Sequence, residues 1–231
     1  MSSIPRRPHA VATSNLAADR ARALALTPVS RETSERLDRL VELLLHWQRR
    51  TSLVAPSTVP RLWTRHIADS LQLLDLVPQA RVWADLGSGA GFPGLVIATA
   101  LAGDPSAMVH LVESNTKKAA FLREAQRATD APATVHLQRI EDFATSFRGR
   151  LDAVAARAVA PLKSLLGQCF PLLGKSGATG LFPKGQHAEL ELRDAAAQMK
   201  SWNMHATLAP SRTDPAGRIV VIRVERGGAA P

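Results

Sequence analysis

Hydrophobic side chains recur in two different rhythms along this chain, and the change between them falls near residue 80. Before it, apolar residues repeat every three to four positions in residues 31–50 and again in residues 62–76. That spacing predicts two amphipathic helices, the first of them capped by Ser30. Because each helix has an apolar face, we expect both helices to cover another part of the fold.

Beyond residue 80, short apolar runs rich in β-branched residues alternate with longer stretches of helical spacing. This alternation predicts an α/β fold with a mainly parallel, doubly wound, seven-stranded sheet and helices on both faces. Ligands of such sheets bind at the carboxyl ends of the strands. The last two runs are joined by a loop with no room for a helix, so they should pair antiparallel. The predicted strands are residues 81–86, 108–112, 134–138, 151–155, 178–182, 205–209 and 218–224.

The first residues follow neither rhythm. Pro5, Pro8 and Pro28 flank an Ala-rich piece that is either a loose helix or a tail, and we expect poor order before about residue 14. These patterns divide the chain into a partly ordered N-terminal extension (1–29), an N-terminal helical cap (30–78) and a ligand-binding domain (79–231).

Composition narrows the class of protein. With 231 residues, 45% hydrophobic and 21% charged, the chain has the make-up of a folded domain with an appendage. The longest uncharged apolar stretch, residues 94–103, is half of the roughly 20 residues that a membrane span requires. Arg6 and Arg7 are not followed by the apolar segment of an export signal, which favours a cytoplasmic protein. Cys169 is the only cysteine, so we expect no internal disulfide and no metal site.

Charge is unevenly distributed along the chain. The net charge is +6 over residues 1–65, −1 over residues 66–160 and +4 over residues 161–231. A near-neutral middle between basic ends suits a small-ligand site with a polyanion-binding rim, although an Arg-rich composition alone gives the same balance. The chain has no tyrosine and only 6 phenylalanines, so recognition of a nucleic acid would depend on Arg and Lys more than on base stacking.

A glycine-rich loop follows the first predicted strand, in residues 85–94. From Gly89 onward it satisfies the dinucleotide fingerprint G-x-G-x-x-G, with Glu113 placed to take ribose hydroxyls. Asp85, however, stands where a dinucleotide would place its diphosphate, and the two anions would repel each other. S-adenosylmethionine carries an ammonium and a sulfonium but no phosphate, so it suits the loop better. An NAD(P)-linked oxidoreductase and an ordinary strand-to-helix turn remain as alternatives.

Six motifs occur in the order and rough spacing of the RsmG (GidB) family, which the sequence resembles over about residues 37–224. The most specific are Arg-His-Ile-Ala-Asp-Ser-Leu and Arg-Ala-Val-Ala-Pro-Leu. The resemblance implies a class I (Rossmann-like) methyltransferase fold and S-adenosylmethionine-dependent formation of 7-methylguanosine in 16S ribosomal RNA. The motifs are residues 65–71, 85–94, 139–142, 157–162, 184–185 and 218–222.

The resemblance also assigns residues. The positions that contact the cofactor in the family are occupied here by Gly87, Phe92, Ile140, Glu141 and Arg157. To these the loop chemistry adds Asp85, Gly89 and Glu113. The sequence departs from the family after its tryptophan, where residues 48–54 lack the usual asparagines, so the role of the segment before about residue 60 transfers less directly.

The sequence has no obvious general base with a second residue to orient it, and methylation of guanine N7 requires none. Guanine N7 has an in-plane lone pair that is unprotonated at neutral pH, so alignment and desolvation suffice without a general base. Enzymes that methylate exocyclic amines resemble one another in an Asn/Asp-Pro-Pro-aromatic turn after the fourth strand. This chain instead has Ala-Ala-Arg-Ala there, at residues 155–158. Pyrimidine C5 enzymes require a thiolate, whereas Cys169 lies in an apolar helical stretch.

Three residues are the candidate catalytic group. Arg157, at the end of the fourth strand, can pair with the cofactor carboxylate and orient guanine through O6. Its alternative role is a structural pair with Asp152 or Glu141. His66 and Asp69 lie three apart on a helix, where they either contact substrate or pair with each other.

Basic residues on loops at the same edge are the candidate RNA contacts. The sequence thus predicts a monomeric methyltransferase acting on small-subunit ribosomal RNA or its particle. The alternatives are the NAD(P)-linked oxidoreductase and a non-catalytic RNA-binding assembly protein. The candidate RNA-binding residues are Arg65, Arg139, Lys184, Arg212 and Arg218.

Overall fold

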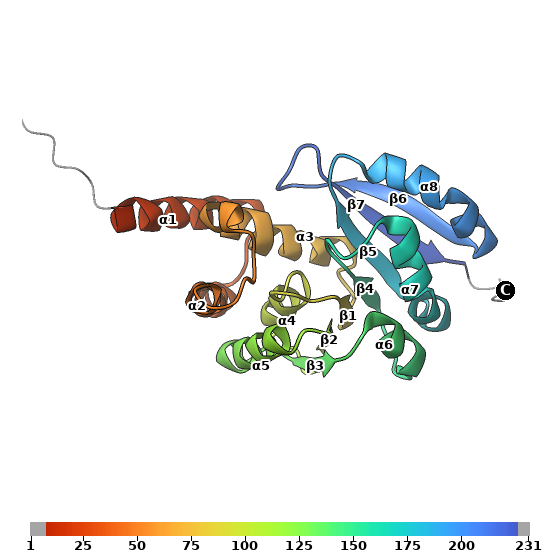
Figure 1. Ribbon diagram of the computed structural model, residues 1–231, viewed down its shortest axis with the longest axis horizontal. Helices are drawn as coiled ribbons and strands as arrows, with labels where there is room; N and C mark the ends of the chain where they lie inside the picture. Colours follow the sequence, from red (N-terminus) through yellow and green to blue (C-terminus); the bar gives the residue numbers. More distant parts are fainter. Residues whose placement is uncertain (1–7, 226–231) are drawn as a thin grey trace, which may run out of the picture.

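Seven strands form one sheet in the order β3-β2-β1-β4-β5-β7-β6, as the computed structural model, which describes residues 8–225, shows (Figure 1). The pairs among β1 to β5 are all parallel, while β7 runs antiparallel to both β5 and β6. The predicted sheet and its antiparallel last pair are therefore confirmed. The strands are β1 (Val82–Leu86), β2 (Met108–Glu113), β3 (Ala133–Leu137), β4 (Ala153–Ala155), β5 (Thr179–Lys184), β6 (Met204–Pro210) and β7 (Arg218–Val224).

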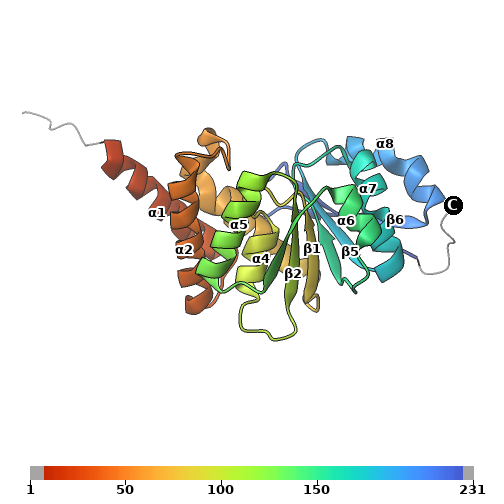
Figure 2. The same cartoon turned by 60° about the horizontal axis from the view of Figure 1, so that its bottom comes forward.

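Helices cover both faces of this sheet. In Figure 2 the sheet stands between α4 and α5 on one side and α6, α7 and α8 on the other. Strand order reverses between β1 and β4, and the loops that leave these two strands diverge there to form the ligand crevice of a doubly wound fold. The helices are α4 (Gly94–Ala100), α5 (Thr116–Thr129), α6 (Ile140–Ser146), α7 (Leu162–Ser176) and α8 (Ala188–Ser201).

Successive side chains of β1 point to opposite faces of the sheet and belong to two separate hydrophobic cores. Trp83 packs on the side of α4 and α5, whereas Ala84 and Leu86 pack with α6 and α7 on the other side. All three side chains are at most 1% exposed, because a central parallel strand is covered on both faces.

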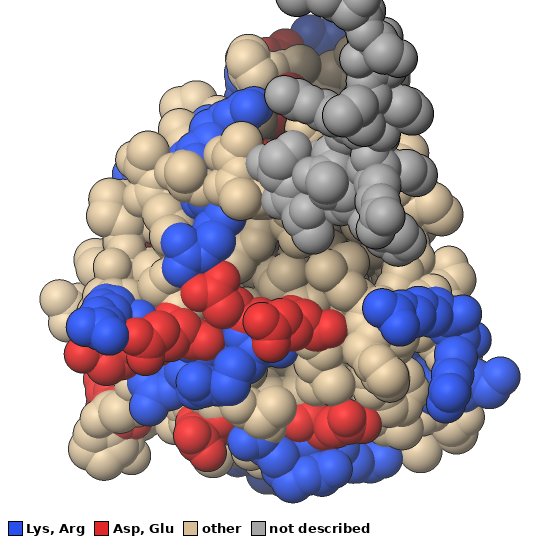
Figure 3. All heavy atoms as spheres, turned by 90° about the vertical axis from the view of Figure 1, so that its left-hand side faces the viewer, with Lys and Arg blue, Asp and Glu red and all other residues tan. Residues whose placement is uncertain are grey.

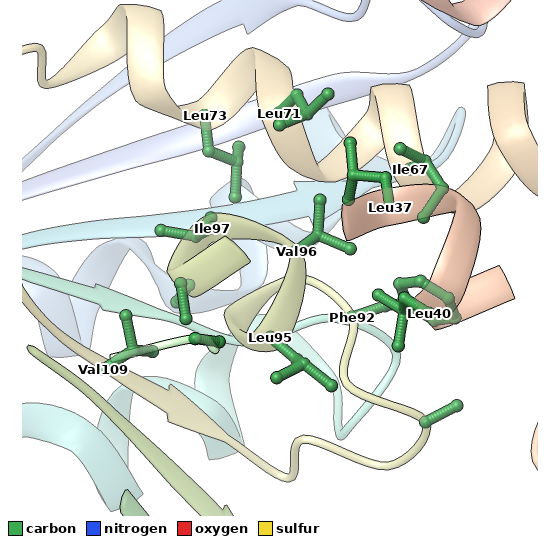
Figure 4. Close-up of a cluster of buried hydrophobic side chains, with 14 of the residues drawn as sticks. Leu37, Leu40, Ile67, Leu71, Leu73, Phe92, Leu95, Val96, Ile97 and Val109 are labelled. Carbon is green, nitrogen blue, oxygen red and sulfur yellow. The ribbon is translucent and has the colours of Figure 1, made fainter. Parts of the chain in front are cut away.

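The N-terminal cap precedes the sheet and shares the first of these cores. Ser30 caps α2 by accepting a hydrogen bond from the Thr33 amide at 3.1 Å, as predicted. Figure 4 shows Leu37 and Leu40 of α2, Ile67 of η2 and Val96 of α4 in one buried cluster. The cap consists of α2 (Arg31–Gln48), the 3₁₀ turn η1 (Pro56–Arg61), the π-helix η2 (Trp63–Ala68) and α3 (Asp69–Leu76), and α1 (Pro8–Leu26) of the N-terminal extension packs against η1 and η2.

Two segments differ from the simplest reading of the sequence. The Ala-rich piece belongs to a 19-residue helix, α1, whose Asp19 and Ala23 are buried, so it is packed rather than a tail. The sequence predicts poor order before about residue 14, and residues 1–7 of that segment lie outside the described residues. After β3, residues 140–146 form the short helix α6, which the spacing of apolar residues did not predict. Among residues 8–225, no helix has the length and apolarity to cross a membrane.

Candidate active site

The glycine loop leaves β1 and enters α4. Gly87 has a φ of +72°, and a Cβ there would lie 2.7 Å from Val159 Cγ2, so only glycine fits this position. The amides of Gly87 and Ser88 both donate to the Val112 carbonyl at 2.9 Å. The loop is thus held against β2 while its backbone stays open to close approach by a ligand.

Asp85 is a buried carboxylate at the base of this loop, 1% exposed. Its Oδ2 accepts a hydrogen bond from the Gly94 amide at 3.0 Å, at the first turn of α4. Its Oδ1 is buried and has no hydrogen-bond partner within residues 8–225. Burial raises the pKa of Asp85 to about 6. A cationic or N–H-bearing ligand would supply the missing partner, and this is the property expected of an S-adenosylmethionine site.

Glu113 joins the glycine loop to the next helix. Its Oε2 accepts from the Gly89 amide at 2.9 Å and its Oε1 from the Asn115 amide at 2.7 Å. Asn115 in turn caps α5 by accepting from the amides of Lys117 and Lys118. Each carboxylate oxygen keeps a further lone pair for a ribose hydroxyl.

A cavity of about 260 Å³ lies beside this carboxylate, and it gathers four predicted cofactor residues from separate parts of the chain. Glu141 in this cavity accepts a hydrogen bond from Gln168 Nε2 of α7 at 2.7 Å. Gln168 was not a candidate from the sequence, because its partner lies 27 positions away in another helix. The lining includes Gly87, Glu113, Ile140, Glu141, Val159 and Gln168.

Arg157 brings the three candidate catalytic residues together. Its Nη1 donates to Asp69 Oδ2 at 3.0 Å and to the Arg65 carbonyl at 2.9 Å, while its Nη2 donates to His66 Nδ1 at 2.7 Å. The acid that pairs with Arg157 is therefore Asp69. The alternative partner Asp152 instead accepts from the backbone amides of Arg81 and Val82 at the start of β1.

Glu141, the other alternative partner of Arg157, is bound to Gln168. His66 and Asp69 do not pair with each other, because both face the guanidinium between them. The three candidate catalytic residues therefore lie together, joined through Arg157 and not through a bond between His66 and Asp69.

The protonation state of His66 follows from its neighbours. Nδ1 accepts from Arg157, so Nε2 carries the hydrogen and donates to Thr58 Oγ1 at 3.0 Å. Burial, together with the nearby charges of Arg157 and Arg65, lowers the pKa of His66 to about 3. The imidazole stacks on Phe92 with ring centroids 4.8 Å apart, and Arg157 Cζ lies 5.3 Å from the same ring. His66 is therefore a neutral, oriented ring and not a proton carrier near neutral pH.

Asp69 also anchors the loop between β6 and β7. Its Oδ1 accepts from Thr213 Oγ1 at 2.8 Å and from Gln72 Nε2 at 2.9 Å. Gln72 Oε1 accepts from the Arg212 amide at 2.8 Å, which fixes the same loop a second time. Neither Gln72 nor Thr213 was a candidate, because the contact joins positions about 140 residues apart.

A second cavity, of about 520 Å³, opens beside Arg157 at the carboxyl ends of the strands. Val159 and Ala160, in the loop after β4, line both cavities. Three of the five candidate RNA contacts line the larger one. Its charged lining residues are Arg65, Asp69, Arg157, Lys184, Glu191, Asp214 and Arg218.

Lys184 differs from the exposed phosphate contact that its loop position suggests. Its side chain is 10% exposed, and Nζ lies 2.8 Å from Glu191 Oε2 and donates to the Ala160 carbonyl at 2.9 Å. Glu191 Oε2 also accepts from the Leu162 amide at 2.6 Å. The charge of Lys184 therefore holds the loop after β4 against α8, and any contact with phosphate stays a prediction.

The remaining candidate RNA contacts are more open. The Arg139 side chain is 71% exposed beside the smaller cavity, and Arg212 is half-exposed and pairs with Asp75 at 2.6 Å. Arg218 Nη1 donates to the carbonyls of Pro215 and Gly217. Figure 3 shows the side that faces left in Figure 1, where acidic and basic side chains alternate instead of forming a single basic patch.

Nucleophilic and metal chemistry have little support in the described part of the chain. Cys169 is fully buried in α7, and this burial raises the pKa of its thiol to about 12. Residues 8–225 hold no cluster of three or more His, Cys, Asp or Glu side chains that could bind a metal ion.

Solved methyltransferase structures share this fold. Methyltransferase PaMTH1 from Podospora anserina, bound to SAH, matches with a TM-score of 0.62 and 14% identity over 97% of this chain and 99% of its own. The O-methyltransferase from Bacillus cereus in complex with SAH matches with a TM-score of 0.57 and 14% identity over 92% of this chain and 99% of its own. At this identity the likeness shows the fold alone.

Sequence relatives are much closer. The ribosomal RNA small subunit methyltransferase G of Bradyrhizobium sp. (strain ORS 278) is 58% identical over 92% of this chain and 94% of its own. The protein of the same name from Nitrobacter hamburgensis is 54% identical over 97% of this chain and 85% of its own. The family model GidB, rRNA small subunit methyltransferase G, matches residues 33–219. The chain therefore belongs to the rRNA small subunit methyltransferase G family.

Proposed function

We propose that this chain transfers the methyl group of S-adenosylmethionine to N7 of a guanine in 16S ribosomal RNA. Membership in a family of small-subunit ribosomal RNA methyltransferases supports the reaction class and the substrate class. The same membership decides against the NAD(P)-linked oxidoreductase. The observation that carries the choice of N7 is the state of His66, which is bound to Arg157 in the wall of the larger cavity.

The residues around the smaller cavity suit the cofactor. Glu113 would accept hydrogen bonds from the ribose hydroxyls, and Asp85, whose Oδ1 lacks a partner, would face the positively charged end. Gly87 and Gly89 leave space for close approach, while Ile140 and Glu141 would flank the adenine. When bound, S-adenosylmethionine supplies an electrophilic methyl group on a sulfonium.

The residues around the larger cavity suit an acceptor that requires no deprotonation. His66 cannot act as a general base, because its pKa is near 3 and its Nδ1 lone pair already accepts a hydrogen bond from Arg157. Guanine N7 presents a free lone pair, so correct placement is sufficient. Three of the five guanidinium N–H groups of Arg157 are committed to protein acceptors, which leaves two for guanine O6 or for a carboxylate of the cofactor.

The RNA would meet the protein at the same edge. Arg65 and Arg218 line the larger cavity and Arg139 lines the smaller one, while Arg212 lies in the loop between β6 and β7. All four would contact phosphates. The chain has few aromatic residues for stacking single-stranded bases, so we propose recognition of a folded RNA shape. We further propose that the protein acts as a monomer in the cytoplasm.

One experiment tests these points together. Purified protein is incubated with methyl-labelled S-adenosylmethionine and either folded 16S RNA, small ribosomal particles or a short linear oligonucleotide of the same sequence, and the nucleosides are then separated. We expect 7-methylguanosine on the folded RNA or the particle, little on the oligonucleotide, and a steep loss of transfer as salt is raised.

Each failure has its own meaning. Label on another nucleoside would refute N7 transfer, and equal labelling of the linear oligonucleotide would refute recognition of shape. An absence of transfer to any substrate would support the non-catalytic assembly protein instead.

A further inference from the structure

Asp19 of α1 is a buried carboxylate whose hydrogen bonds all reach a distant helix. It is 3% exposed and forms no ion pair with any residue in the described range 8–225. Its Oδ2 accepts from the backbone amides of Trp63 at 2.9 Å and Thr64 at 3.1 Å, and its Oδ1 accepts from Thr64 Oγ1 at 2.7 Å. A charge buried this deeply requires such partners, and here the first turn of η2 supplies them.

The helix that Asp19 contacts has no cap from its own sequence. It runs through η2 and α3 without a break, and Leu62, at the junction with the preceding 3₁₀ turn η1, offers no side-chain acceptor. The first amides of a helix have no acceptor within the helix, and a negative charge near them is favourable. Asp19 thus caps this helix from 44 positions earlier in the chain.

The residues that follow the capped turn are those of the active site. Arg65 supplies the carbonyl that Arg157 binds, and His66 and Asp69 supply the two side chains. The turn is wound as a π-helix, a form common at functional sites, in which the extra residue per turn changes where the following side chains point. The position of the first turn therefore sets the position of all three groups.

Asp19 is itself held from two sides. Ala23, one turn later in α1, is 1% exposed. Arg20 lies with its Cζ 5.2 Å from the Trp63 ring and pairs with Asp38 of α2 at 2.7 Å. The carboxylate is consequently fixed relative to η2 by packing as well as by its own hydrogen bonds.

We propose that Asp19 is a positioning residue for methyl transfer, which holds the helix that presents Arg65, His66 and Asp69 to Arg157 and the substrate. The proposal rests on the proposed function of that cluster. It also gives the N-terminal helix a role in the reaction, although the sequence pattern sets this segment apart as an extension.

The first test is Asp19→Asn, measured against Glu35→Gln. Asparagine has nearly the same shape, but it carries no charge and has only one acceptor oxygen, so it cannot accept both from the two backbone amides and from the Thr64 hydroxyl. We expect the turnover rate at saturating RNA to fall about tenfold, since small misplacements at a reacting centre are costly. Affinity for S-adenosylmethionine should stay within about twofold, because the glycine loop is untouched. Glu35→Gln also removes one carboxylate charge from the cap, but it breaks only the exposed pair with Arg31 within α2, and it should leave turnover unchanged.

A second pair of variants reaches the same hydrogen bond from the other end. Thr64→Val removes the hydroxyl that donates to Asp19 Oδ1, whereas Thr64→Ser keeps it. We expect the Val variant to lose turnover and the Ser variant to retain it. All rates are measured well below the lowest unfolding temperature of the set, so that the comparison is between folded proteins. If Asp19→Asn does not fold, the Thr64 pair decides.

The wild-type rate on folded 16S RNA reports on the proposed function, and the ratio of variant to wild-type rate reports on Asp19. Turnover of Asp19→Asn equal to that of Glu35→Gln, or of Thr64→Val equal to that of Thr64→Ser, would overturn the proposal. The expected split between an impaired turnover rate and an intact cofactor affinity would support it, because simple loss of stability lowers both.

Discussion

Replacing Arg157 with methionine separates its catalytic role from its structural one. The side chains of Arg157 and Asp69 are 16% and 9% exposed, so Arg157→Met leaves a nearly buried carboxylate without its cation. Breaking a buried pair in this way costs about 3–5 kcal/mol. Asp69 keeps its bonds from Gln72 and Thr213, and both partners retain some contact with solvent. We therefore expect the free energy of unfolding to fall by about 2–4 kcal/mol.

The double variant Arg157→Met/Asp69→Asn removes the unpaired charge as well. It should be more stable than Arg157→Met alone by about 1–2 kcal/mol, because the two residues are energetically coupled. Urea unfolding followed by the fluorescence of the buried Trp63 and Trp83 measures the stabilities. Methyl transfer at saturating RNA, under conditions where every variant is folded, measures the rates.

The two measurements should diverge. Stability returns in part in the double variant, whereas the methylation rate stays low because no group replaces the free N–H groups of Arg157. Recovery of the rate together with stability would refute an orienting role for Arg157 and leave it as a purely structural partner of Asp69. A rate unchanged in Arg157→Met would refute the site assignment itself.

Four further variants test the cofactor and RNA assignments. The raised pKa of Asp85, about 6 against an ordinary 3.8, means that its contribution to stability is fully present below about pH 4 and is lost as the pH rises through about 6. The shift corresponds to about 3 kcal/mol, and Asp85→Asn should flatten this part of the pH dependence of unfolding, whereas an unchanged profile would contradict the assignment. Glu113→Ala should weaken S-adenosylmethionine binding by about 1–3 kcal/mol in calorimetry, with NAD as a ligand that should not bind. Arg139→Ala and Arg218→Ala should each lower RNA affinity and reduce the slope of log affinity against log salt by about one per phosphate contact, and slopes equal to wild type would exclude them from the interface.

Features were predictable from the sequence where all the interacting residues lie within one helix turn or one loop. Ser30 caps α2 within a single turn. The loop after β1 needs glycines because Gly87 has a positive φ and because a Cβ at Gly94 would collide with Asp85. The sheet follows from strand and helix periodicity in the same way. The short loop between the last two runs also predicted that β6 and β7 would pair antiparallel, because it has no room for a helix. The position of β7 between β5 and β6 was not predicted.

Other features depend on contacts between distant positions and carry no local signal. Nothing near Asp19 in the sequence indicates an acceptor for the amides of residues 63–64. Lys184 similarly reads as a loop cation, because Glu191 reaches it only after α8 folds back on the sheet. The motif at residues 157–162 indicated Arg157, but not that Asp69 would be its acid partner, because that choice depends on how the cap packs.

The shared core of cap and sheet has a consequence for how RNA is met. Ile67 of η2, Leu95 of α4 and Trp83 of β1 belong to one buried cluster, so the helix with the candidate catalytic residues is packed directly on the domain that holds the glycine loop. A helix packed this closely is not free to swing as a lid. The protein side of the site is therefore preorganised during folding, and binding need not order it again. Two surfaces of fixed shape would then meet, and a guanine would have to leave its stack to reach a pocket that stays in place.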